Sequence, residues 1–144
     1  MFRNVLVALD ASPPARRAFA EAADLALASN ARLTVISVVP PVPPASFRAP
    51  VDVESLRREV EREAEQLVHE AVDELPGELP VTTMIKHGEP AKRILEQLLE
   101  GRHDLLVMGS RGRGRIATNL LGSVAADVYF HSRVPMLVIQ PEDE

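Results

Sequence analysis

The sequence predicts a single α/β domain built on an open five-stranded parallel sheet, with strand order 3-2-1-4-5 and helices on both faces. Two observations support this fold class. Short, almost continuously apolar runs alternate with longer segments of helical period, as expected when strands of a parallel sheet are buried on both faces. The chain has 144 residues, the size of one domain, so residues 1–144 are expected to form one unit.

The first strand is expected at Arg3–Leu9, where the sequence RNVLVAL is short and rich in valine and leucine. Ser12 is a candidate N-cap for the helix that follows, and Pro13 suits a first helical turn because its missing N–H would be unpaired there. The residues that share one face of this helix are mostly small and can pack closely on a sheet. They are Ala15, Ala18, Phe19, Ala22, Ala23 and Ala26.

The second strand is expected at Ala31–Val39, and the second helix begins after Asp52, a candidate cap. The prolines between them, at positions 40, 41, 43, 44 and 50, exclude a regular helix and predict an extended loop. Apolar side chains recur every three or four residues in the second helix, and its glutamates and arginines indicate a solvated face. The predicted inward face comprises Leu56, Val60, Ala64, Leu67, Ala71 and Leu75, and Pro76 and Gly77 end the helix.

The remaining three strands are expected at Val81–Lys86, Asp104–Met108 and Val134–Gln140. The third helix is predicted to begin at Pro90 and to stop at Gly101. Its inward residues are predicted to be Ile94, Leu95, Leu98 and Leu99. Those of the fourth helix are predicted to be Leu120, Leu121, Val124, Ala125 and Val128.

The strand order places a ligand crevice at one edge of the sheet. In open α/β sheets, ligands bind outside the carboxyl ends of the strands, at the point where the strand order reverses. For the order 3-2-1-4-5 that point lies between strands one and four. Two loops meet there, Asp10–Pro14 and the loop that begins at Gly109.

Composition and charge exclude several classes of function. The chain has no cysteine, which rules out disulfides, cysteine zinc sites and thiol catalysis and fits a reducing compartment. Its net charge of −5 makes nucleic acid a poor partner. No apolar stretch approaches the roughly 20 residues that span a bilayer, and the N-terminus lacks the long apolar region of a signal peptide. We therefore expect a cytoplasmic protein that binds neither nucleic acid nor membranes.

Residues 109–123, GSRGRGRIATNLLGS, directly follow the fourth predicted strand. Glycines let backbone N–H groups converge on a phosphate, and the N-terminus of a following helix adds unpaired donors and a positive dipole end. Arg111, Arg113 and Arg115 can neutralise an anion, and Ser123 can donate its hydroxyl. The alternative is a solvated glycine-rich turn, but the position of the loop at the predicted crevice favours a phosphate site.

The spacing Gly109-x2-Gly112-x9-Gly122-Ser123 resembles the ATP-binding signature of the universal stress protein family. Other segments are similar to the same family: LDAS to its opening strand, HGEP to its turn into the third helix, and SRVPMLVI to its closing strand. The resemblance covers essentially all of residues 2–140 and is to the branch of the family that binds ATP.

The resemblance implies a role for each matching position. Asp10 and Ala11 would lie against the adenosine, and the backbone of Val38 would contact the adenine. The remaining positions of the implied ATP-binding set follow the path of the ribose and phosphates: Met108, Gly109, Arg111, Gly112, Arg113, Gly122, Ser123 and Val124. Two positions depart from the family pattern, Ala11, where glycine is frequent, and Arg113, where a small residue often stands.

The implied function is that of an ATP-binding, nucleotide-dependent stress-response regulator, with a magnesium ion held through the phosphates near Ser12 or Ser123. No catalytic residue is predicted. The Walker form GxxxxGK[ST] is absent and no group to orient an attacking nucleophile stands out, so at most a slow ATPase is expected. The four histidines, His69, His87, His103 and His131, lack metal-ligand spacing, and no protein-bound metal is expected.

Several alternatives remain open. Asp10 follows the first strand directly, so it could cap the next helix or act in a slow ATPase or nucleotidyl-transfer enzyme. The ligand could be cyclic AMP or another adenine nucleotide. The chain could also be a nucleotide-free interaction module that uses residues 40–50 or the second helix. The sequence encodes neither the stress, the pathway nor the physiological partner.

A homodimer through the fifth strand, Val134–Gln140, is also expected. In the predicted order this strand lies at an edge of the sheet, and MLVI is an apolar segment to leave there. Exposed strand edges invite pairing with another chain. Universal stress proteins often dimerise through this strand, so the resemblance implies the same.

Overall fold

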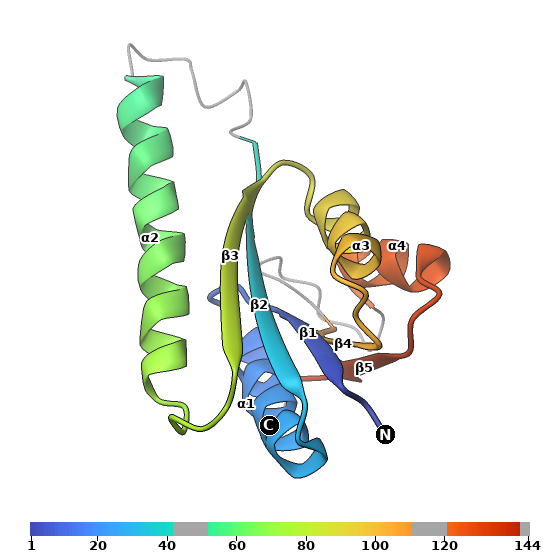
Figure 1. Ribbon diagram of the computed structural model, residues 1–144. Helices are drawn as coiled ribbons and strands as arrows, with labels where there is room; N and C mark the ends of the chain where they lie inside the picture. The colour runs from blue at the N-terminus through green and yellow to red at the C-terminus, as the bar shows by residue number, and fades with distance from the viewer. Residues whose placement is uncertain (42–51, 111–120, 142–144) are drawn as a thin grey trace.

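The computed structural model describes residues 1–41, 52–110 and 121–141 (Figure 1). It confirms the predicted fold: a sheet of five parallel strands in the order β3-β2-β1-β4-β5. The strands are β1 (Asn4–Ala8), β2 (Arg32–Val39), β3 (Val81–His87), β4 (Leu105–Gly109) and β5 (Met136–Ile139). The helices between them are α1 (Pro13–Ser29), α2 (Val53–Asp73), α3 (Pro90–Glu100) and α4 (Ser123–His131).

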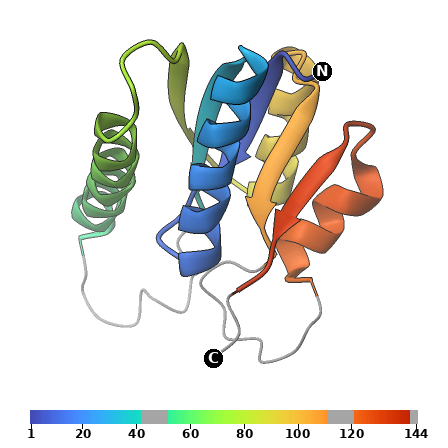
Figure 2. The same ribbon diagram turned by 90° about the horizontal axis from the view of Figure 1, so that it is seen from below.

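Helices cover both faces of the sheet, two on each (Figures 1 and 2). On one face, α1 and α2 pack with alternate residues of the central strands, among them Val5, Val7 and Val107. On the other face, α3 and α4 pack with Leu6 and Leu106. The central strands are therefore buried on both sides, which explains why their sequences are continuously apolar rather than alternating.

The sequence of α1 accounts for its start and its packing. Ser12 is the N-cap, and its hydroxyl accepts a hydrogen bond of 3.3 Å from the N–H of Ala15. The predicted stripe of small residues is confirmed, since every member is buried: Ala15, Ala18, Phe19, Ala22, Ala23 and Ala26. Small side chains let this helix lie close to β1 and β4 and fix its first turn at the carboxyl end of the sheet.

The second helix begins as predicted but packs less tightly. The carboxylate of Asp52 accepts hydrogen bonds from the hydroxyl of Ser55 and from two backbone N–H groups, and these bonds hold the pKa of Asp52 below its usual range. The predicted inward face is only half-buried, whereas the buried residue of α2 is Val68, which the prediction omitted. The helix lies toward the β3 edge of the sheet and packs one side of itself on the core (Figure 1).

Two further predictions about packing are wrong. Leu99 was expected to point inward, but it is 76% exposed, because Leu98 occupies the inward position at that level of α3. The fourth helix was expected to include Leu121, but α4 begins at Ser123 with Gly122 as its N-cap. Leu121 still packs against the α3–α4 side of the core from a non-helical position, which explains the apolar pattern that suggested a longer helix. Leu120 lies outside the described residues.

A closed polar network ties β1 to β4 at the amino end of the sheet. The side-chain amide of Asn4 donates to the carbonyls of Gly101 and Arg102, at 2.8 and 3.2 Å, so its oxygen faces Nδ1 of His103 at 3.0 Å. On the other side of the ring, Nε2 of His103 lies 3.0 Å from Nε2 of Gln97. This pattern assigns the proton of the neutral imidazole to Nδ1, with Nε2 accepting from Gln97.

His103 is buried at the centre of this network. It is 6% exposed, and burial lowers the pKa of His103 from its usual 6.5, more than the hydrogen bond with Asn4 raises it. Gly101 makes room for the ring, because a Cβ there would lie 2.3 Å from Nε2 of His103. Asp104 completes this end by accepting from the N–H groups of Arg3 and Asn4, at 2.8 and 2.9 Å.

Candidate functional site

A cavity of about 450 Å³ opens at the carboxyl ends of β1 and β4, where the sheet order reverses. The pairing of β1 with β4 stops at Val7 and Val107, and its pairing with β2 stops at Ala8 and Ile36. Beyond these positions, Leu9, Asp10 and Ala11 after β1 and Ser110 after β4 line the cavity. The cavity has the size and place of a small-molecule site in an open α/β fold.

The end of β2 supplies a pair of backbone groups to this cavity. The carbonyl of Ile36 accepts from the N–H of Leu9, whereas the carbonyl of Val39 accepts from Gly88 of the β3 side. Because backbone groups alternate in direction along a strand, Val38 turns its N–H and C=O to the side of β1. The β1 strand has already ended there, so these two groups face the cavity that Val38 lines.

The turn between β1 and α1 positions Asp10 and Ala11 in the wall. One carboxylate oxygen of Asp10 accepts a hydrogen bond of 2.7 Å from the N–H of Ser12, which forms a tight local turn. The cap of α1 is therefore the hydroxyl of Ser12, and Asp10 braces that cap rather than providing it. This arrangement leaves the half-buried Asp10 carboxylate at the cavity as an acceptor for hydroxyl groups.

The end of β4 contributes Met108, Gly109 and Ser110. At Gly109, a Cβ would lie 2.9 Å from the backbone carbon of Pro14 and 3.0 Å from the N–H nitrogen of Ala15. The first turn of α1 packs so closely on β4 that no side chain fits between them. Glycine at this position thus has a structural reason that the sequence analysis missed, since the sequence suggested only a ligand path.

Ser110 ties together the elements around the glycine-rich segment. Its N–H donates to the carbonyl of Ile139 at 2.8 Å, and its carbonyl accepts from the N–H of Gly122 at 2.6 Å. The two ends of the segment between residues 110 and 122 are therefore joined by one hydrogen bond at the cavity. Three predicted site residues of this segment, Arg111, Gly112 and Arg113, lie outside the described residues.

The first turn of α4 faces the cavity with Gly122, Ser123, Val124 and Ala125. Gly122 is the N-cap and has no side chain to accept from the N–H groups of the first turn, which have no intrahelical acceptor either. Its φ of −65° is one that any residue adopts, so the tight bend inferred from the sequence is not what selects glycine. A glycine there instead leaves the helix N-terminus uncovered on the cavity side.

The wall formed by α2 was not predicted. Three residues of the predicted inward face line the cavity: Val60, Ala64 and Leu67. Glu63 also lines it and is exposed, as predicted for the glutamates of this helix. Pro90 and Ile94 of α3 close the opposite side. A period of three to four residues could have suggested an apolar contact for α2, but not that a cavity separates it from the sheet.

The charges of the cavity are unevenly distributed. Its described lining includes two carboxylates, Asp10 and Glu63, and no lysine or arginine. The N-terminus of α4 also lines the cavity and brings N–H groups without intrahelical acceptors and the positive end of its dipole. The arrangement can therefore bind a ligand that has hydrogen-bond donors at one end and an anion at the other.

Within residues 1–41, 52–110 and 121–141, no three histidine or carboxylate side chains come together in a way that could hold a metal ion. Across the same ranges, every helix is too short or too polar to cross a membrane.

Comparison with solved structures matches this architecture to known folds. The structure superposes on the hypothetical protein MJ0577 with a TM-score of 0.84, at 23% identity, over 100% of this chain and 99% of that one. It also superposes on a universal stress protein in complex with cAMP, with a TM-score of 0.65 at 29% identity, over 96% of this chain and 97% of the other.

Sequence comparison leads to one family. A universal stress protein of Thermus aquaticus, from the QAH/OAS sulfhydrylase 3′ region, is 36% identical over 140 residues, which is 97% of this chain and 100% of the relative. The model of the universal stress protein family matches residues 1–140. The chain therefore belongs to the universal stress protein family.

Proposed function

We propose that the cavity between β1 and β4 binds ATP and that this binding regulates which partners the protein engages. The observation that carries the proposal is the polarity of the cavity. One end presents the backbone pair of Val38 and the carboxylate of Asp10, and the other presents the uncovered N-terminus of α4. A nucleotide has the same polarity, with a base and sugar hydroxyls at one end and phosphates at the other.

The base would lie at the end of β2. An adjacent N–H and C=O of Val38 complement N1 and the N6 amine of adenine, which accept and donate one hydrogen bond each. The neighbouring walls are apolar, with Val39 and Leu67 available to contact the ring faces. Asp10 would accept from the ribose hydroxyls, as a carboxylate after an early strand does in other nucleotide sites.

The phosphates would lie at α4. The N–H groups of Ser123 and Val124 and the hydroxyl of Ser123 can donate to phosphate oxygens, and the helix dipole favours negative charge there. Arg111, Gly112 and Arg113 would complete the cradle from the segment between residues 110 and 122. A magnesium ion would bind through the phosphates, next to Ser123, rather than through a protein cage.

A neighbour of known ligand supports an adenine nucleotide in general. The universal stress protein solved with cAMP shares the fold at 29% identity. Cyclic AMP is therefore the main competitor of ATP for this site. The two ligands differ most at the phosphate end, where ATP would use the glycine and arginine positions that a single cyclic phosphate cannot span.

Regulation would follow from where the phosphates lie. The segment between residues 110 and 122 joins β4 to α4, and contacts of Arg111, Gly112 and Arg113 with the phosphates would shift its conformations. Of the two carboxylates in the described lining, Asp10 would be engaged by the ribose and Glu63 is an exposed residue of α2, so the proposal assigns neither as a general base. The proposal is accordingly a binding protein with at most slow hydrolysis.

The test is a calorimetric titration of ATP with magnesium into nucleotide-stripped protein, with AMP, cyclic AMP and GTP as comparators. The proposal predicts ATP binding tighter than about 100 µM, or roughly −5.5 kcal/mol, and weaker binding of GTP. Preference for cyclic AMP would keep the site but replace the ligand. No heat and no thermal shift with any nucleotide would refute the proposal and favour a nucleotide-free interaction module.

We also propose that the protein forms a homodimer through β5. This strand forms an edge of the sheet, its residues are only half-buried or exposed, and Leu137 is 36% exposed. Two aromatic residues near the end of α4, Tyr129 and Phe130, are 58% and 78% exposed, and such residues are enriched in interfaces. Sedimentation at micromolar concentration should show a dimer that L137K converts to a monomer, whereas a wild-type monomer would refute the pairing.

A further inference from the structure

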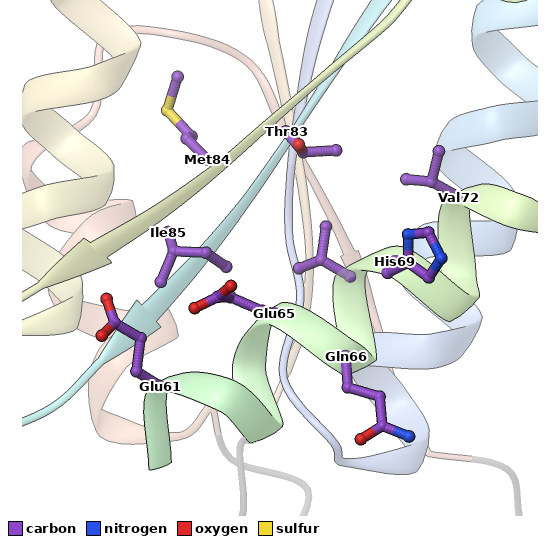
Figure 3. A pocket seen from close by; sticks show the side chains of 9 residues that line it. Glu61, Glu65, Gln66, His69, Val72, Thr83, Met84 and Ile85 are labelled. Carbon is purple, nitrogen blue, oxygen red and sulfur yellow. The ribbon is translucent and has the colours of Figure 1, made fainter. Parts of the chain in front are cut away.

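A second hollow, of about 770 Å³, lies between α2 and β3 and is lined by a different set of residues from the nucleotide cavity. We call it the α2–β3 groove. Its floor is formed by Val68 and Val72 of α2 and by Thr83 and Ile85 of β3. Figure 3 shows Thr83 and Ile85 directed toward α2, whereas Met84 points to the other side of the strand.

The backbone of β3 is open along this groove. Among the described residues, β3 forms an edge of the sheet and pairs only with β2. The carbonyl of Pro80 and the N–H of Gly88 bond to β2, so the even-numbered residues turn their backbone groups inward. Thr83 and Ile85 therefore turn their N–H and C=O groups outward, and an added strand could pair with them.

The wall that faces this edge is acidic. Glu61 and Glu65 lie four residues apart on α2, and Figure 3 shows both carboxylates directed toward β3, whereas Gln66 points away from it. The described lining of the groove contains no lysine or arginine. The imidazole of His87 already contacts this wall, since its Nε2 lies 3.3 Å from Oε1 of Glu61.

The repeat distances of helix and strand match along the groove. Residues four apart on a helix rise by about 6 Å. Alternate residues of an extended strand are about 6.6 Å apart and point to the same face. A strand laid along β3 would thus present every second side chain to the α2 wall, with successive side chains opposite Glu61 and Glu65.

We propose that the α2–β3 groove binds an extended basic segment of a partner protein, added as a strand along β3 with lysine or arginine at alternate positions facing Glu61 and Glu65. Backbone hydrogen bonds to Thr83 and Ile85 provide the pairing, and the two carboxylates select the charge. The aliphatic stems of the basic side chains cover Val68 and Val72. The α2–β3 groove shares no lining residue with the nucleotide cavity, although both lie along α2.

The test uses a peptide of about nine residues with blocked termini that alternates lysine and valine, titrated into the full chain at about 50 mM salt. We expect saturable binding that weakens when salt is raised to about 300 mM, since the Debye length shortens. The double variant E61Q/E65Q should weaken binding at least tenfold. A peptide with glutamate in place of lysine should not bind.

A matched control separates the groove from overall charge. Glu59 and Glu70 lie on α2 outside the groove lining, so E59Q/E70Q changes the net charge by the same amount and should bind the peptide as the wild type does. Amide hydrogen exchange adds a position-specific readout: the amides of Thr83 and Ile85 should become protected on peptide binding, and those of β5 should not.

Three outcomes would overturn the proposal. The first is no binding at millimolar peptide, and the second is equal loss of binding in both double variants. The third is a dimer, seen by sedimentation, in which the β3 edge amides are already protected before peptide is added and lose this protection on dilution. A second copy of the chain would then cover the groove.

Discussion

The polar groups at the two ends of the sheet are used differently. At the amino end, Asn4, Gln97 and His103 bond to one another and to backbone groups, and the network is closed. At the carboxyl end, Val38 and the first turn of α4 present backbone groups to a cavity instead. The comparison indicates that polar groups hydrogen-bonded within the chain hold the strands together, whereas those turned to a cavity are available to bind a ligand.

Gly122→Val should produce the largest effect at the carboxyl end. A valine side chain would cover the N–H groups of the first turn of α4, so ATP affinity should fall by at least about 100-fold. The φ of −65° suits any residue, but Gly122 is buried, so the free energy of unfolding should fall by about 1–3 kcal/mol through overpacking rather than backbone strain. Calorimetry and urea denaturation measure the two quantities.

Gly77→Val is the matched control for this variant, because nothing lies within 4 Å of a Cβ at that position. It should leave both affinity and stability unchanged. Unaltered ATP affinity in Gly122→Val would show that α4 does not hold the phosphates.

Gly101→Ala should have the converse effect at the amino end. The added Cβ would lie 2.3 Å from the ring of His103 and 2.5 Å from the amide nitrogen of Gln97, so the network must open. We expect a loss of about 1–3 kcal/mol in the free energy of unfolding, with ATP affinity unchanged. Urea denaturation measures this loss, with Gly77→Ala as the control variant whose free energy of unfolding should be unchanged. A neutral Gly101→Ala would mean that the network contributes little.

Asp10→Asn should weaken ATP binding by about tenfold while the fold is preserved. An asparagine oxygen can still accept from the N–H of Ser12, so the turn before α1 is kept. The substitution removes only the negative charge of the side chain that would accept hydrogen bonds from the ribose hydroxyls. Turnover that vanishes in this variant while affinity persists would instead indicate an enzyme that uses Asp10 in catalysis.

The pH dependence of stability should show the smallest effect. Burial lowers the pKa of His103 in the folded state below its unfolded value near 6.5, so the folded protein binds fewer protons than the unfolded chain in that range. The contribution of His103 is therefore fully present above pH 6.5 and is lost as the pH falls through the folded-state pKa. Denaturation of wild type and His103→Gln between about pH 5 and 7 should show a shallower dependence in the variant. Equal slopes would contradict the assignment of a neutral, buried imidazole.

The sequence predicted the fold well because the fold depends on local patterns. Apolar runs such as that of β1, the cap at Ser12 and the small-residue face of α1 each act within a few residues, and the alternation of elements then restricts the topology. The start of α4 was misplaced because the apolar pattern runs on both sides of Gly122, whereas the helix begins only after this extended N-cap residue.

The site was predicted only in part, for a physical reason. The loops after β1 and β4 could be located because the strand order brings them together. The α2 wall with Glu63 and the pairing of Asn4 with His103 depend on contacts between distant parts of the chain, and no local pattern encodes them. Gly109 shows the same limit, because glycine is needed there for the close approach of Pro14, which is distant in the sequence.

The most direct test of the contrast between the two ends is amide hydrogen exchange of the wild-type protein with and without saturating ATP and magnesium. The account predicts slower exchange at Val38 and at the first-turn amides of α4, from Ser123 to Ala125, with no local change at Asn4 and His103. Unchanged exchange at Val38 and α4 in the presence of bound ATP would contradict it, because the nucleotide would then occupy another part of the molecule.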